Sequence, residues 1–141
     1  MQWYSLGFIF DRDLSRVLLI HKNRPTWQRG KLNGIGGKVE TDETALDCIV
    51  REVREESGLQ IEPDRWFEIG VMTSEAWYVT CFTCAYHGAP EDAYSVTDEQ
   101  VEWMDVNALP ASVISNLMWL IPLCRDRLSE ANTFTFEIHY Q

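Results

Sequence analysis

Residues 37–59 read GKVETDETALDCIVREVREESGL. The segment from Asp42 to Ser57 contains neither Pro nor Gly and is followed by Gly58, so the pattern predicts a helix that ends at this glycine. We expect Thr41 or Asp42 near the N-cap, because both side chains can accept a hydrogen bond from the first turn. The apolar positions recur at helical spacing and predict the buried face; they are Ala45, Leu46, Ile49, Val50 and Val53.

Three carboxylates share one face of this predicted helix. At about 100° per residue, Glu52, Glu55 and Glu56 project at about 0°, 300° and 40°. Like charges at this spacing destabilise a helix by a few tenths of a kcal/mol per pair. The cluster is therefore most easily explained as a set of oxygen ligands for a hard divalent cation, and Mg²⁺ is the natural one. The alternative is an ordinary solvated acidic face.

The same stretch fits the pattern G-x5-E-x7-R-E-U-x-E-E-x-G-U, in which U is aliphatic, and so resembles the Nudix box. The matching residues are Gly37, Glu43, Arg51, Glu52, Val53, Glu55, Glu56, Gly58 and Leu59. The resemblance implies hydrolysis of nucleoside diphosphates linked to another group. It also implies a cofactor, Mg²⁺ with Mn²⁺ as a substitute, held by Glu52, Glu55, Glu56 and the carbonyl group of Gly37.

The resemblance also assigns supporting and catalytic roles. Arg51 and Glu43 are expected to pair with, or orient, the glutamates that bind metal. Glu99 corresponds to a downstream glutamate that the family often uses as an additional metal ligand or as the base, although a charged turn before a strand would explain it equally simply. The general base is therefore Glu52 or Glu99, and the sequence leaves both open.

Residues outside the box bear on the substrate. The segment from Leu32 to Val39 resembles the MutT-type branch that hydrolyses damaged nucleotides, and in that branch the residue matching Asn33 contacts the purine side of the pocket. Asn116, six residues before Pro122, falls where the branch places an Asp or Asn that reads the purine edge. The structural alternatives are a turn at Asn33-Gly34 and a helix cap at Asn116.

Charge is distributed unevenly along the chain. Residues 1–38 carry seven Lys or Arg and two Asp, a net of +5, whereas the remainder carries five basic and twenty acidic residues, a net of −15; together they give −10. Such an acidic protein has no general attraction for nucleic acid polymers. Lys22 and Lys38 belong to the basic stretch before the predicted metal helix, and we expect them to contact the phosphates or the base of the substrate. The alternative is that they are ordinary exposed side chains on a loop.

Composition limits the remaining possibilities. A chain of 141 residues with 45% hydrophobic content fits one domain, residues 1–141, and we expect a monomer or homodimer. No apolar run approaches the roughly 20 residues of a membrane span, and no signal peptide is evident, so cytoplasmic localisation without membrane partners is expected. Cys81 and Cys84 form a C-x2-C pair, but both lie in a predicted strand, and we expect all four cysteines to be reduced and mostly buried thiols.

Periodicity predicts an α+β fold, an α/β/α sandwich with a mixed sheet between helices, as the Nudix resemblance also implies. The expected strands are residues 4–10, 16–22, 65–73, 76–86, 100–106 and 133–140, with the pair 65–73 and 76–86 antiparallel. A second helix is expected within residues 114–130. Pro122 lies inside that pattern and predicts a kink or a late helix start.

The predicted function is Mg²⁺-dependent hydrolysis of a nucleoside triphosphate, including oxidised purine nucleotides, to a monophosphate and pyrophosphate. The first alternative is a dinucleoside polyphosphate hydrolase or another hydrolase of linked nucleoside diphosphates, because Trp77-Tyr78 lies close to the position at which that type carries a Tyr. A further alternative is a Nudix-fold module that binds nucleotides without catalysis. Such modules usually have an incomplete box, whereas this one is complete.

Overall fold

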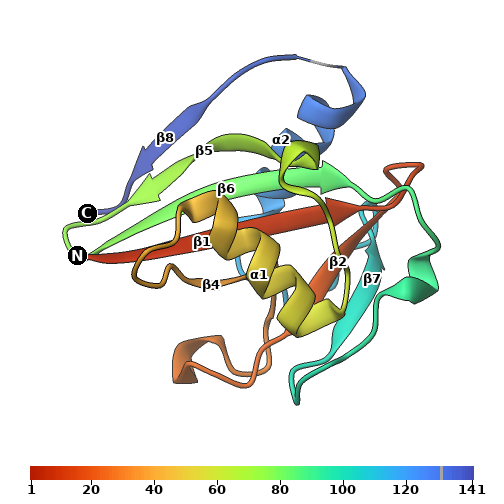
Figure 1. Ribbon diagram of the computed structural model, residues 1–141, viewed down its shortest axis with the longest axis horizontal. Coiled ribbons are helices and arrows are strands. Elements are labelled where there is room, and N and C mark those ends of the chain that lie inside the picture. The colour runs from red at the N-terminus through yellow and green to blue at the C-terminus, as the bar shows by residue number, and fades with distance from the viewer. Residues whose placement is uncertain (131) are drawn as a thin grey trace.

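The computed structural model describes residues 1–130 and 132–141, which form a mixed β-sheet with a helix on each face (Figure 1). The strands are β1 (Gln2–Phe10), β2 (Arg16–His21), β3 (Leu32–Asn33), β4 (Ile35–Lys38), β5 (Phe67–Thr73), β6 (Trp77–Ala85), β7 (Val101–Asp105) and β8 (Phe136–His139). The helices are α1 (Ala45–Ser57) and α2 (Leu117–Ser129), with single 3₁₀ turns at Thr26–Gln28, Pro63–Arg65 and Pro90–Asp92.

The centre of the sheet is a parallel pair formed by β1 and β6, in register from Gln2 opposite Trp77 to Phe10 opposite Ala85. The strand order is β3-β2-β1-β6-β5-β8, and β4 and β7 pair with β1 and β2 respectively. β5 is antiparallel to β6, as predicted, and β8 is parallel to β5. The sheet is therefore mixed, and the predicted α/β/α sandwich of the α+β class is confirmed.

Alternation along β1 divides the hydrophobic core into two parts. Phe8 and Phe10 point to the face covered by α2, whereas Ile9 packs with Ile49 and Val53 beneath α1. All five side chains are fully buried. Since successive strand residues point to opposite faces, one strand anchors both helices. The predicted apolar stripe of α1 is thus the face that packs on the sheet.

The start of α1 differs from the prediction. Thr44 is the N-cap: its hydroxyl accepts from the Asp47 amide at 3.0 Å, and the Asp47 carboxylate accepts from the Thr44 amide at 3.0 Å. The prediction of Thr41 or Asp42 is wrong, because Asp42 has a left-handed backbone with φ of 70° and cannot continue a right-handed helix. The predicted end is confirmed, since Gly58 has φ of 76° and closes the helix.

Other predicted boundaries also shift, and β1, for example, begins at Gln2 rather than at residue 4. The strand expected from Arg65 begins at Phe67, because a 3₁₀ turn occupies Pro63–Arg65. The closing strand is limited to Phe136–His139. Pro122 is the sixth residue of α2, so the helix does not start late; proline has no amide hydrogen, and the carbonyl group four residues earlier loses its helical partner.

Candidate active site

Close approach between β4 and its neighbours creates the floor of the site. A Cβ atom on Gly36 would lie 2.0 Å from the Ser5 carbonyl oxygen, and one on Gly37 would lie 2.4 Å from Oε1 of Glu52. Both distances are far below van der Waals contact, so a side chain at Gly36 would clash with the backbone and one at Gly37 would displace the Glu52 carboxylate. The two glycines therefore allow the Glu52 carboxylate to lie directly against the β4 backbone.

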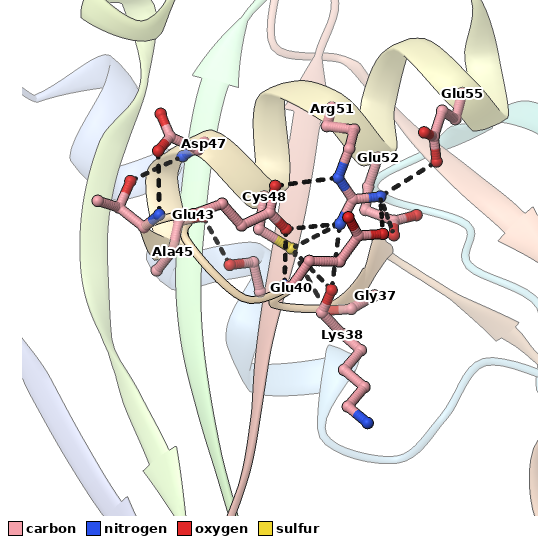
Figure 2. Close-up of polar contacts among 12 residues, drawn as sticks. Gly37, Lys38, Glu40, Glu43, Ala45, Asp47, Cys48, Arg51, Glu52 and Glu55 are labelled. Carbon is pink, nitrogen blue, oxygen red and sulfur yellow. Dashed lines mark hydrogen bonds and ion pairs between the residues drawn. The ribbon is translucent and has the colours of Figure 1, made fainter.

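Arg51 is the centre of a network of carboxylates (Figure 2). Its guanidinium group donates to both oxygens of Glu43, at 3.0 and 2.6 Å, to Oε1 of Glu52 at 2.9 Å and to Oε2 of Glu55 at 3.1 Å. It also donates to the Lys38 carbonyl group at 3.1 Å. The predicted pairing of Arg51 with Glu43 is present, and the hydrogen bond from Arg51 lowers the pKa of Glu43 to about 2. Arg51 therefore holds the end of β4 against α1.

The box glutamates differ in their surroundings. Burial raises the pKa of Glu52, while burial followed by the charge of Glu52 raises the pKa of Glu56 to about 8. Oε2 of Glu56 is buried and has no hydrogen-bond partner. Glu55 is half-exposed, with 52% of its side-chain surface accessible, and turns toward Arg51. The structure thus places Glu52 and Glu56 in a poorly hydrated pair, with Glu55 at its rim.

This donor set fits a divalent cation. An unpaired buried carboxylate oxygen beside a second carboxylate is unfavourable until a positive charge is present. Carboxylate and carbonyl oxygens are the ligands that Mg²⁺ prefers. Across residues 1–130 and 132–141, however, no three His, Cys, Asp or Glu side chains already converge as a metal-binding group. The side chains at the rim, above all Glu55, would have to reorient to complete the coordination.

Glu99 anchors the loop between β2 and β3. The residue is buried, and its carboxylate accepts from Lys22 Nζ at 3.1 Å and from the amides of Asn23 and Arg24 at 2.6 and 3.2 Å. Burial on its own would raise the pKa of Glu99, but the hydrogen bonds from Asn23 and Lys22 outweigh it, and the pKa lies below its ordinary value. The positive charge of Lys22 also offsets part of the rise in the pKa of Glu56, so Lys22 acts on both carboxylates.

The two asparagines predicted to contact substrate lie on different elements. The Asn33 side chain donates to Oε1 of Gln28 at 3.1 Å and accepts from the Gly34 amide at 2.8 Å. Asn116 immediately precedes α2, but its side chain makes no capping hydrogen bond. Its amide nitrogen lies 3.6 Å from the Met72 sulfur, and its amide oxygen is buried without a partner. The structure therefore does not support a side-chain capping role for Asn116.

Lys38 and Cys48 also lie beside the Arg51 network. The Lys38 side chain is exposed, and Figure 2 shows it extending away from Arg51, so only its carbonyl group joins the network. Cys48 was predicted only as a buried thiol, yet its sulfur lies 3.6 and 3.5 Å from the carbonyl oxygens of Gly37 and Lys38. Burial raises its pKa to about 11. The sequence could have indicated that Cys48 lies next to this network, because it precedes Arg51 by three residues and so shares its helix face.

Comparison with known proteins agrees with this geometry. The NUDIX domain family model matches residues 4–119. The chain belongs to the Nudix family. It is 32% identical to the oxidized purine nucleoside triphosphate hydrolase of Danio rerio, over 88% of this chain and 81% of that protein, and 30% identical to the Mus musculus protein of the same name, over 86% and 80%. The NUDIX hydrolase of Nitrosomonas europaea superposes with a TM-score of 0.76 at 16% identity, covering 99% of this chain and 78% of that one.

A complete box and relatives named as hydrolases make this Nudix protein a hydrolase. All four cysteines are free and buried, as expected. Neither helix in the described residues is long and apolar enough to cross a membrane.

Proposed function

We propose that this Nudix hydrolase cleaves nucleoside triphosphates, including oxidised purine nucleotides, to a monophosphate and pyrophosphate, with Mg²⁺ as cofactor and Mn²⁺ as a substitute. The observation that carries the purine preference is the buried, unpartnered amide oxygen of Asn116. A buried acceptor without a partner is unfavourable, and a substrate donor would satisfy it. An amide can both donate and accept, which suits the mixed edge of an oxidised guanine.

The carboxylates of Glu52, Glu55 and Glu56, with the Gly37 carbonyl group, would hold the metal. When bound, Mg²⁺ neutralises phosphate charge and lowers the pKa of the attacking water. Arg51 holds Glu52 in place by the 2.9 Å hydrogen bond, and Lys22 supplies a positive charge beside the site for the phosphate chain.

We assign the general base to Glu52 rather than Glu99. Glu52 lies in the box, and burial raises its pKa above the ordinary value, so it is the stronger proton acceptor of the two. Both oxygens of Glu99 already accept hydrogen bonds from Lys22, Asn23 and Arg24, and its lowered pKa makes it a weaker base. Its contribution is to hold Lys22 and the adjoining loop in position, and an additional metal contact would require those bonds to rearrange.

A hydrolysis screen tests this proposal. The purified protein is incubated with ordinary and oxidised purine and pyrimidine triphosphates and with dinucleoside polyphosphates, in Mg²⁺, in Mn²⁺ or with a chelator. We expect metal-dependent release of pyrophosphate, fastest for a purine substrate. Inorganic phosphate as the first product, or preferential cleavage of the dinucleoside compounds, would overturn the assignment in favour of another Nudix reaction.

A further inference from the structure

Gln28 stands out in the turn that joins β2 to β3. Among residues 23–30 it alone is half-buried, and the others are exposed. Its backbone amide donates to the Pro25 carbonyl group and its carbonyl group accepts from the Lys31 amide, both at 2.9 Å. The backbone at Gln28 is therefore bonded on both sides, and its side chain reaches Asn33 on β3. The sequence analysis assigned no role to Gln28.

The side chain of Asn33 is held at both of its polar atoms. The Gly34 backbone amide can only donate, and the atom that lies 2.8 Å from it is therefore the oxygen Oδ1 of Asn33. The other atom is the nitrogen Nδ2, which donates one hydrogen to Oε1 of Gln28 at 3.1 Å. Nδ2 carries a second hydrogen, so the group that Asn33 can offer a ligand at this end is a donor.

Backbone hydrogen bonds bring β3 beside the segment that leads to Asn116. The Leu32 amide donates to the Ser112 carbonyl group, and the Leu32 carbonyl group accepts from the Ile114 amide, both at 3.0 Å. In the proposed function, Asn116 contributes a buried acceptor, its amide oxygen. A base that bonds to both asparagines must therefore carry a donor for Asn116 and an acceptor for Asn33.

We propose that Gln28 is a positioning residue for base specificity, because its side-chain oxygen holds the Asn33 amide with its nitrogen available as a donor to the base. This inference rests on the proposed function. The last side-chain torsion of asparagine has a broad range, so contacts at both polar atoms are needed to fix the amide plane. Glu99 supports the arrangement, since its carboxylate accepts from the amides of Asn23 and Arg24 at the start of the same turn.

Three substitutions separate the acceptor of Gln28 from the shape of its side chain. Gln28→Met keeps the length and removes the acceptor, whereas Gln28→Glu keeps an acceptor oxygen in the same place. Thr26→Ala changes an exposed side chain of the same turn and is the matched control. The readout is kcat/KM for the purine triphosphate that is fastest in the hydrolysis screen, divided by kcat/KM for CTP. This ratio cancels effects on folding and on phosphate binding that both substrates share.

We expect Gln28→Met to lower this ratio about fivefold, the usual value of one hydrogen bond, through a higher KM for the purine and with little change in kcat. Gln28→Glu and Thr26→Ala should keep the ratio of the wild type. In an Asn33→Ala background, Gln28→Met should cause no further loss, because Gln28 acts through Asn33. An equal fall for purine and pyrimidine, or losses that add in the double variant, would overturn the proposal.

NMR of the metal-free protein without substrate tests the positioning step on its own. The side-chain amide resonances of Asn33 are assigned by their loss in Asn33→Ala. We expect Gln28→Met to move one of them upfield, because its hydrogen loses an acceptor, and Thr26→Ala to leave both in place. Asn33 resonances that Gln28→Met does not move would also overturn the proposal. A wild type that hydrolyses no purine triphosphate would refute the proposed function and the specificity role with it, whereas the NMR comparison would still decide whether Gln28 positions Asn33.

Discussion

Glu56 allows a quantitative test of the metal-site geometry through the pH dependence of stability. Its pKa is about 8 in the folded protein, against 4.5 for the free side chain. Between these values the folded state holds a proton that the unfolded state has released. The stabilising contribution is therefore complete below about pH 4.5 and is lost as the pH rises toward 8.

The expected magnitude follows from linkage. Each pH unit in this window is worth about 1.4 kcal/mol, so raising the pH from about 5 to about 7.5 should cost the metal-free protein about 3 kcal/mol through Glu56. Glu56→Gln keeps the shape of the side chain and cannot ionise, so it should lack this loss. Urea unfolding in the presence of a chelator, measured at several pH values, gives the slope of the unfolding free energy against pH for the wild type and for Glu56→Gln.

Glu55→Gln is the matched control. Glu55 is the residue before Glu56 in α1, but its side chain is 52% exposed. Its replacement should therefore leave the pH dependence of the unfolding free energy close to that of the wild type. Adding Mg²⁺ at about pH 7.5 should restore stability to the wild type and much less to Glu56→Gln, because the cation favours the ionised carboxylate. Identical pH slopes for Glu56→Gln and the wild type would refute the reasoning.

The remaining predictions concern catalysis. Glu55→Gln and Glu56→Gln should each lower kcat by about 100-fold with the fold retained, as judged by circular dichroism, and near-normal rates in both would contradict the metal assignment. Hydrolysis in heavy-oxygen water should label pyrophosphate, since the MutT-type resemblance favours attack at the β phosphorus; mass spectrometry would find label in the monophosphate if attack were at the α phosphorus. Asn116→Ala should lower kcat/KM for the preferred purine by roughly 5- to 150-fold and much less for pyrimidines. An unchanged purine-to-pyrimidine ratio would show that Asn116 does not read the base.

Local sequence determined the features that depend on near neighbours. The face shared by Glu52, Glu55 and Glu56, the buried stripe of α1 and its end at Gly58 all follow from helical period and a glycine at the C-terminus. The start of α1 was misjudged, because Thr41, Asp42 and Thr44 could each cap it and the choice depended on which pair bonded reciprocally. Thr44 and Asp47 formed that pair.

Tertiary structure decided what depends on contacts between distant segments. Glu99 bonds to a loop more than seventy residues away, and only that contact shows it as an anchor with a lowered pKa. The box spacing treats Glu55 and Glu56 alike, whereas packing leaves Glu55 exposed and buries Oε2 of Glu56. Burial and register are properties of the assembled chain, and no local pattern encodes them.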